Sequence, residues 1–182
     1  QEAKKFLQKV DAAKTVEAMP RRYGLFPGSS FPAKGEQKAL VILVEFADCE
    51  FFTPDANQYF TSLLNAEGCD LDGATGSARD YFVQNSSGIF LPDFDVYGPV
   101  TLSQPVKYYG GNDRWGNDEA PHRMIIEACQ LLDSEVDFSL YDRDGDGTID
   151  NVFVFYAGRG EATSGGANTC LLYTSPSPRD TR

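Results

Sequence analysis

Residues 38–48 read KALVILVEFAD, with six consecutive apolar side chains from Ala39 to Val44. A strand that is exposed on one face alternates apolar and polar residues, whereas a strand buried on both faces is apolar throughout. The uninterrupted run therefore predicts a strand whose sheet is covered on both sides. Such strands are typical of α/β proteins.

Two helices are predicted after this strand. Thr53 is expected to cap the first, with Pro54 in the first helical position and Asp55 at the positive end of the helix dipole. Ser77 and Asp80 are spaced as a capping box and are expected to open the second. Both signals place helices directly after the buried strand in the chain.

After these helices, the sequence predicts further strands and one more helix. Residues 89–102 (IFLPDFDVYGPVTL) are predicted as strand material that is broken at Pro92 and at the Gly98-Pro99 turn. A third helix is predicted from Asp118 to Asp133, and a last apolar strand at residues 151–158 (NVFVFYAG). The order of these elements predicts the fold class α/β (α+β), a mixed sheet with helices packed against it.

Length and charge narrow the possible functions. The chain has 182 residues and a formal net charge of −11. This length suits one domain. Binding to nucleic acid rests on clustered lysine and arginine, so the acidic balance argues against a nucleic-acid partner and against an anionic membrane surface. No apolar run approaches the roughly 20 residues that a membrane span needs.

The two ends of the chain differ from the middle. Residues 170–180 (CLLYTSPSPRD) read as the translation of the end adaptor of transposase-based DNA sequencing libraries. We therefore interpret residues 170–182 as a non-native tail and exclude them from the fold. Residues 1–37 join a charged, lightly amphipathic stretch to a Pro/Gly/Ser-rich stretch that is predicted to be a linker or an extended strap. The predicted domain is 38–169, cut within its gene.

Three cysteines remain in the native part, namely Cys49, Cys69 and Cys129. An odd number leaves open a disulfide with a cysteine encoded further along the gene. Cys129 lies on the apolar stripe of the third predicted helix, and a small buried core residue explains it equally well.

The strongest chemical signal is DRDGDGTID at residues 142–150. Its carboxylates alternate along the chain around Gly147, so a tight loop can turn them inward around one cation, while Ile149 anchors the loop in the core. Oxygen ligands suit a hard cation, and without a cation four close carboxylates would repel one another, which points to calcium. The predicted ligands are the side chains of Asp142, Asp144 and Asp146, the carbonyl of Thr148, and Asp150 directly or through water.

This loop resembles an EF-hand loop only in part. The twelfth position, where an EF-hand has a bidentate glutamate, is Phe153, and a strand follows instead of a helix. These departures favour a structural calcium site over a sensing switch, with an affinity on the order of 10⁻⁴ M. The alternative interpretation is a solvated Asp/Gly turn between a helix and a strand.

Several segments in order resemble a known family. KALVILVEFAD (38–48), TGSARDYFVQNSSGIFLPDFDVYGPVTL (75–102), YYGGND (108–113) and VDFSLYDRDGDGTIDNVFVFYAGRGEA (136–162) are similar to secreted bacterial metalloproteases of the immune inhibitor A type. The resemblance runs from about Arg21 to Thr169. It implies a secreted, zinc-dependent endopeptidase that acts on proteins or peptides, with a zincin-like catalytic domain of which this chain is the N-terminal part. It also implies that residues 1–37 are the end of a propeptide or its junction.

The resemblance also shows what is missing. The family binds zinc through H-E-x-x-H on a helix, and its Glu acts as general base while zinc polarises water and the peptide carbonyl. That motif is absent from this sequence, which has one histidine. The family places it beyond the segment AGRGEATSGG (157–166), so no zinc or catalytic residue can be assigned here and the chain as given is expected to be inactive. Only the calcium-loop residues carry over.

A function of another class stays open, that of a calcium-dependent extracellular binding or adhesion module. A dockerin of that class has two short calcium repeats, each beside a helix, in a small domain. Here a single loop lies inside a larger α/β pattern, which favours the protease.

Overall fold

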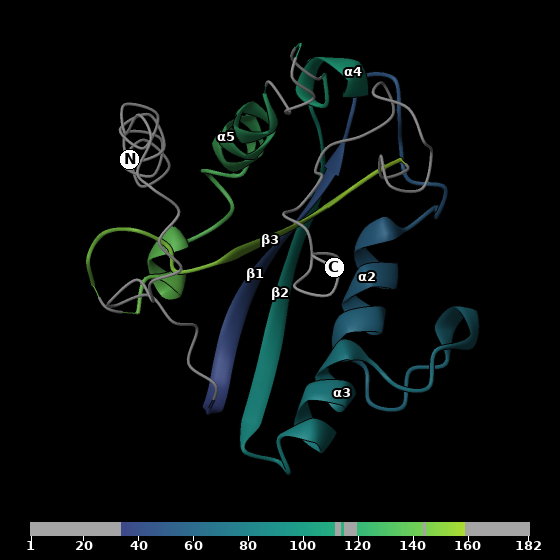
Figure 1. Cartoon of the computed structure of the whole chain (residues 1–182), viewed down its shortest axis with the longest axis vertical. Helices are drawn as coiled ribbons and strands as arrows, with labels where there is room; N and C mark the ends of the chain where they lie inside the picture. Colours follow the sequence, from purple (N-terminus) through teal and green to yellow (C-terminus); the bar gives the residue numbers. More distant parts are fainter. Residues whose placement is uncertain (1–33, 112–113, 115–119, 144, 159–182) are drawn as a thin grey trace.

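The apolar run forms the middle strand of a sheet. In the computed structural model, which describes residues 34–111, 114, 120–143 and 145–158, β1 (Gly35–Glu45) lies between β2 (Phe90–Thr101) and β3 (Val152–Tyr156) (Figure 1). Both neighbours pair with β1 in parallel. The prediction of a mixed sheet is therefore wrong for the described strands. Each neighbour is reached through a helical crossover, the kind of connection that parallel pairing requires.

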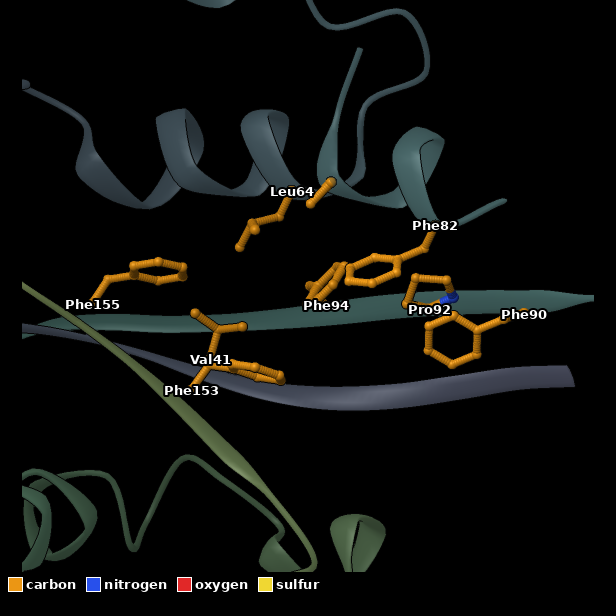
Figure 2. A pocket seen from close by; sticks show the side chains of 9 residues that line it. Val41, Leu64, Phe82, Phe90, Pro92, Phe94, Phe153 and Phe155 are labelled. Atoms are coloured by element: carbon orange, nitrogen blue, oxygen red, sulfur yellow. The ribbon is translucent and has the colours of Figure 1, made fainter. Parts of the chain in front are cut away.

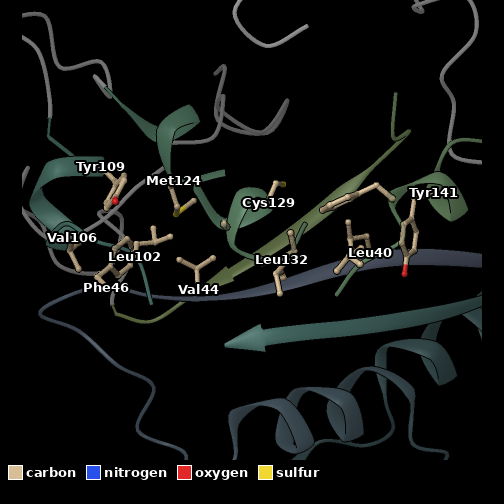
Figure 3. Close-up of a cluster of buried hydrophobic side chains, with 14 residues drawn as sticks. Leu40, Val44, Phe46, Leu102, Val106, Tyr109, Met124, Cys129, Leu132 and Tyr141 are labelled. Carbon is tan, nitrogen blue, oxygen red and sulfur yellow. The ribbon is translucent and has the colours of Figure 1, made fainter. Parts of the chain in front are cut away.

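β1 is buried from both sides, as its composition predicts. Each residue from 39 to 44 is at most 1% exposed. The side chains at even positions belong to a core cluster with α5 (Pro121–Leu131), part of which is shown in Figure 3. The side chains at odd positions pack in a second cluster with α2 (Ala56–Asn65). The predicted α/β class is thus confirmed, with helices on both faces of the sheet.

The remaining elements are short. They are α3 (Ala78–Asn85), α4 (Val106–Tyr109) and the 3-10 helices η1 (Leu71–Gly73) and η2 (Phe138–Tyr141). In Figure 1, α2 and α3 lie on one side of the sheet and α5 lies on the other. β1 begins at Gly35 rather than at residue 38, because residues 35–37 already pair with residues 90–92 of β2. The predicted tail (170–182) and residues 1–33 lie outside the described residues.

The start of α2 corrects one prediction. The helix begins at Ala56, and its N-cap is Asp55 rather than Thr53. The Asp55 Oδ1 atom accepts a hydrogen bond of 3.0 Å from the backbone N–H of Gln58. A carboxylate satisfies a free N–H and also meets the positive end of the helix dipole, which explains why the aspartate serves as the cap.

The start of α3 confirms the predicted capping box. Ser77 Oγ accepts from the Asp80 N–H at 3.2 Å, and Asp80 Oδ2 accepts from the Ser77 N–H at 2.9 Å. Asp80 Oδ2 also accepts from the Gly68 N–H at 2.8 Å, which ties the preceding turn to the helix. The hydrogen bonds from Ser77 and then Gly68 lower the pKa of the Asp80 carboxyl group below its ordinary value of 3.8.

We expect Asp80→Asn to lower the denaturation midpoint at neutral pH. Because the folded pKa is lowered, the carboxylate stabilises the fold above the ordinary value of 3.8, and this contribution is lost as pH falls through the folded pKa. Urea denaturation between pH 7 and pH 2 should show the gap between the two proteins closing at the acid end. Glu67→Gln, in the neighbouring turn, is the control. An equal gap at every pH would contradict a role for the charge.

β2 also differs from its prediction, because it is one continuous strand through both prolines. It lies at the edge of the described sheet, where only one side needs ladder hydrogen bonds and proline is tolerated. The second break is absorbed as a bulge. Ile42 pairs with Tyr97 and Val44 pairs with Val100, so Gly98 and Pro99 together face one residue of β1.

α5 is shorter than predicted. It begins at Pro121 rather than Asp118, since proline fits a first helical turn whose N–H groups have no helical partner. It ends at Leu131; Leu132 is its C-cap, and Asp133, the predicted end, lies in the turn that follows. Residues 115–119 lie outside the described part of the chain.

The described cysteines are all free thiols, at positions 49, 69 and 129. Cys129 is 1% exposed in the core beside α5, as its place on the apolar stripe predicts. Burial raises the pKa of its thiol to about 11. This residue therefore acts as a small apolar core residue.

β3 is covered less completely than its apolar sequence predicts. Phe153 and Phe155 remain 38% and 36% exposed. Both lie on the face of the sheet that carries α2 and α3, where they help to line an apolar hollow of about 270 Å³ (Figure 2). Leu64 and Phe82 line the same hollow from the two helices. The helices thus cover β1 and β2 but leave part of β3 open.

Candidate functional site

The loop at 142–150 connects η2 to β3 at the amino-terminal end of the sheet. Tyr141 ends η2 and is 2% exposed, and its backbone carbonyl accepts a hydrogen bond of 2.9 Å from the Asp150 N–H. This bond closes the loop at its base. Asp144 lies outside the described residues, so its predicted ligand role is not described by the structure.

Asp142 organises the first half of the loop. Its Oδ1 atom accepts from the Asp146 N–H at 3.1 Å, and its Oδ2 atom accepts from the Gly147 N–H at 2.7 Å. Gly147 has φ = +82°, the left-handed conformation that favours glycine and that a sharp turn at this position needs. The chain therefore wraps around the Asp142 carboxylate.

The second half of the loop turns back toward the core. Asp146 Oδ1 accepts from the Thr148 N–H at 2.8 Å. Ile149 is partly buried and packs against the core cluster beside α5, as the sequence predicts. Carboxylates that accept backbone N–H groups keep further lone pairs for another partner. The oxygens of Asp142 and Asp146 can therefore hold the loop and contact a cation together.

Asp150 has a different environment from the other predicted ligands. Its Oδ2 atom accepts from the Arg143 N–H at 3.1 Å and lies 3.9 Å from the Arg143 guanidinium Nη1 atom. The Asp150 side chain is 12% exposed. One of its oxygens is therefore engaged within the protein, which leaves Oδ1, or a bridging water, for a metal ion.

Within the described ranges, no group of three or more histidine, cysteine, aspartate or glutamate side chains is placed to hold a metal ion. Asp142, Asp146 and Asp150 are described and do not form such a group, while Asp144 is outside those ranges and Thr148 would contribute its backbone carbonyl. The donor chemistry fits calcium, since the remaining groups offer only oxygen.

A polar network beside the loop was not predicted from the sequence. Tyr141 Oη donates to Asp95 Oδ2 at 2.7 Å, and the Lys38 ammonium donates to the same atom at 2.9 Å. Burial, followed by the hydrogen bond to Asp95, raises the pKa of Tyr141. The hydrogen bond to Asp95 raises the pKa of Lys38. The pairing of β1 with β2 brings Lys38 close to Asp95, and the packing of η2 against β1 adds Tyr141.

A second hollow, of about 600 Å³, opens at the carboxyl-terminal edge of β1 and β3. Cys49 lines it beside Asp48 and Glu50. Burial and then the charges of Asp48 and Glu45 raise the pKa of the Cys49 thiol, so this cysteine has a poorly ionised side chain.

No protein-family model matches the chain, and no curated protein matches it. Within the described part of the chain, no helix is long and apolar enough to cross a membrane. The class that the fold defines is an α/β protein with an open, parallel three-stranded sheet in its described part.

Proposed function

We propose that the loop at 142–150 binds one calcium ion and holds η2 against the start of β3. The observation that carries this proposal is the Asp142 carboxylate, which accepts two backbone N–H groups and so curls the loop around its own oxygens. The ligands in this proposal are Asp142, Asp144, Asp146, the Thr148 carbonyl, and Asp150 through Oδ1 or a water.

The surroundings support a structural role rather than a sensing role. β3 follows the loop directly, and the twelfth position, Phe153, lies in that strand and lines the apolar hollow (Figure 2). A phenylalanine offers no oxygen, so the bidentate ligand of sensor loops is missing. A rigid strand also cannot swing as the second helix of a sensor does. The site is therefore proposed as a weak, structural one.

We expect calcium to stabilise the 182-residue protein. With a dissociation constant on the order of 10⁻⁴ M, about 10 mM calcium is a hundredfold excess and should raise the free energy of unfolding by about 2.7 kcal/mol. Titration calorimetry should show binding heat, and thermal denaturation should show a higher midpoint. Magnesium at the same concentration controls for ionic strength.

Two variants sharpen this test. Asp144→Ala should abolish both the binding heat and the rise in midpoint. Asp70→Ala removes a carboxylate beside η1, far from the loop in sequence, and should leave both unchanged. Absence of binding heat and of any rise in midpoint for the unaltered protein at millimolar calcium would refute the site.

For the chain as a whole, we propose that it is part of a secreted, zinc-dependent metalloendopeptidase of the immune inhibitor A type, with a zincin-like domain. The support is the ordered resemblance of residues 21–169, which includes the aspartate-rich loop at 142–150. The residues present do not fit a zinc centre, because the sequence has one histidine and no H-E-x-x-H. No catalytic step is therefore derived for this chain.

We expect the source gene to encode an H-E-x-x-H helix after the codon for Thr169, followed by a third zinc ligand. Long-read sequencing of the source DNA tests this. Genomic codons for LLYTSPSPRD followed by a natural stop would refute both the adaptor interpretation and the protease assignment.

We also expect no casein cleavage by the purified chain. Cleavage that a zinc chelator stops would show that the catalytic groups lie within these residues.

A further inference from the structure

Arg143 lies between two of the predicted calcium ligands and joins the loop to the sheet. Its backbone N–H donates to Asp150 Oδ2 at 3.1 Å, and its guanidinium Nη1 atom lies 3.9 Å from the same oxygen. Its Nη2 atom donates to the backbone carbonyl of Lys38 in β1 at 2.6 Å. One side chain thus contacts a loop carboxylate and a sheet carbonyl that is 105 residues away in sequence.

The contacted point of β1 belongs to the polar network described above. The Lys38 side chain donates to Asp95 in β2, and Tyr141, which ends η2, donates to the same carboxylate. β1, β2 and η2 therefore meet at Asp95. Arg143 adds the loop to this junction, because it contacts the backbone of Lys38.

We infer that Arg143 is the positioning residue through which calcium in the 142–150 loop stabilises the amino-terminal end of β1. This inference rests on the proposed calcium site and deepens it. A cation bound by Asp142 and Asp146 would fix the loop backbone on both sides of Arg143. The guanidinium is already oriented by Asp150. With the loop backbone fixed, its hydrogen bond to the Lys38 carbonyl would break less often.

The chemistry of arginine suits this position. Its planar fork donates in two directions at once, whereas a lysine ammonium is a single point charge. The Arg143 side chain is 24% exposed, so its contacts are partly shielded from water. Arg143 is not a predicted ligand, and its replacement removes no oxygen from the calcium site. Coupling can therefore be measured separately from binding.

The test is amide hydrogen exchange of residues 36–42 in the full chain, with and without saturating calcium, alongside calorimetric titration of calcium. In the unaltered protein, calcium should slow exchange in this segment about tenfold, as expected for a hydrogen bond to a charged group. In Arg143→Gln the slowing should be less than about twofold. Each protein is measured at a calcium concentration that saturates it, so a change in calcium affinity does not affect the measured slowing.

Two further variants guard against a merely structural effect. Arg143→Lys keeps the charge but loses the fork, and it should lose most of the calcium-dependent slowing. Arg123→Gln removes another arginine that bonds a side chain, Tyr108, away from the loop, and should retain the full slowing. If Arg143→Gln does not fold, the exchange measurement on Arg143→Lys tests the inference by itself.

The outcomes separate the two proposals. If the unaltered protein binds calcium but exchange in residues 36–42 does not change, the coupling is wrong and the calcium site stands. If Arg143→Gln or a folded Arg143→Lys shows the full slowing, the coupling does not pass through Arg143. If the unaltered protein shows no binding heat, the calcium site is wrong and the coupling falls with it.

Discussion

Replacing Gly98 with alanine should lower the free energy of unfolding by about 3 kcal/mol or more. Gly98 has φ = +90°, a conformation that side chains rarely adopt, and it lies in the bulge where β2 shifts register against β1. A Cβ atom there would lie 2.6 Å from the backbone oxygen of Leu43 and 2.9 Å from the backbone nitrogen of Val100. Both contacts are with backbone, so neither neighbour can rotate away.

The bulge is also held from the helix side, which limits relaxation. The Asn57 side-chain amide donates to the carbonyls of Val96 and Gly98, at 3.1 and 2.9 Å. Moving Gly98 to relieve the clash would strain these hydrogen bonds between α2 and β2. Relief in one place therefore costs contacts in another.

Gly88→Ala is the matched control for the Gly98 variant. Gly88 has φ = +77°, but a Cβ atom there would meet nothing within 4 Å. It should cost only the conformational strain of about 1–2 kcal/mol. Urea denaturation of both variants separates strain from clash. Equal losses would show that β2 relaxes at the bulge and that the close contacts are unimportant.

Some features of the fold could be predicted from the sequence, and others could not. The buried character of β1 was predictable because a run of six apolar residues has no polar face, and the α3 capping box was predictable because it is local. The continuity of β2 was not, since prolines usually interrupt strands. Only the position of β2 at the sheet edge, and the bulge at Gly98, explain why both prolines are accommodated.

In the candidate site, too, local contacts were predictable from the sequence and a long-range contact was not. The spacing of Asp142 and Asp146 around Gly147 predicted a tight loop, since those residues interact within a few positions of one another. The contact between Arg143 and Lys38 joins residues far apart in sequence and depends on where β3 pairs with β1. No local pattern encodes it. An arginine within an acidic loop is the one sequence signal that could have drawn attention to it.

Ile42→Ala should lower the free energy of unfolding by about 2–5 kcal/mol. Ile42 is fully buried in β1 and belongs to the core cluster that includes Met124 and Leu132. The substitution removes three carbons, worth about 0.8 kcal/mol each in transfer free energy, and leaves a cavity that adds to the loss. β1 is paired on both sides and covered on both faces, so little collapse around the cavity is possible.

Ile89→Ala provides the same chemical change outside the core. Ile89 is 55% exposed, directly before β2, and its truncation should change stability by less than about 0.5 kcal/mol. Chemical denaturation of both variants measures the difference. A small loss at Ile42 would mean that α5 moves in to fill the cavity, and that β1 is held mainly from the α2 side. A large loss at both positions would show that Ile89 is buried in solution by a further part of the protein.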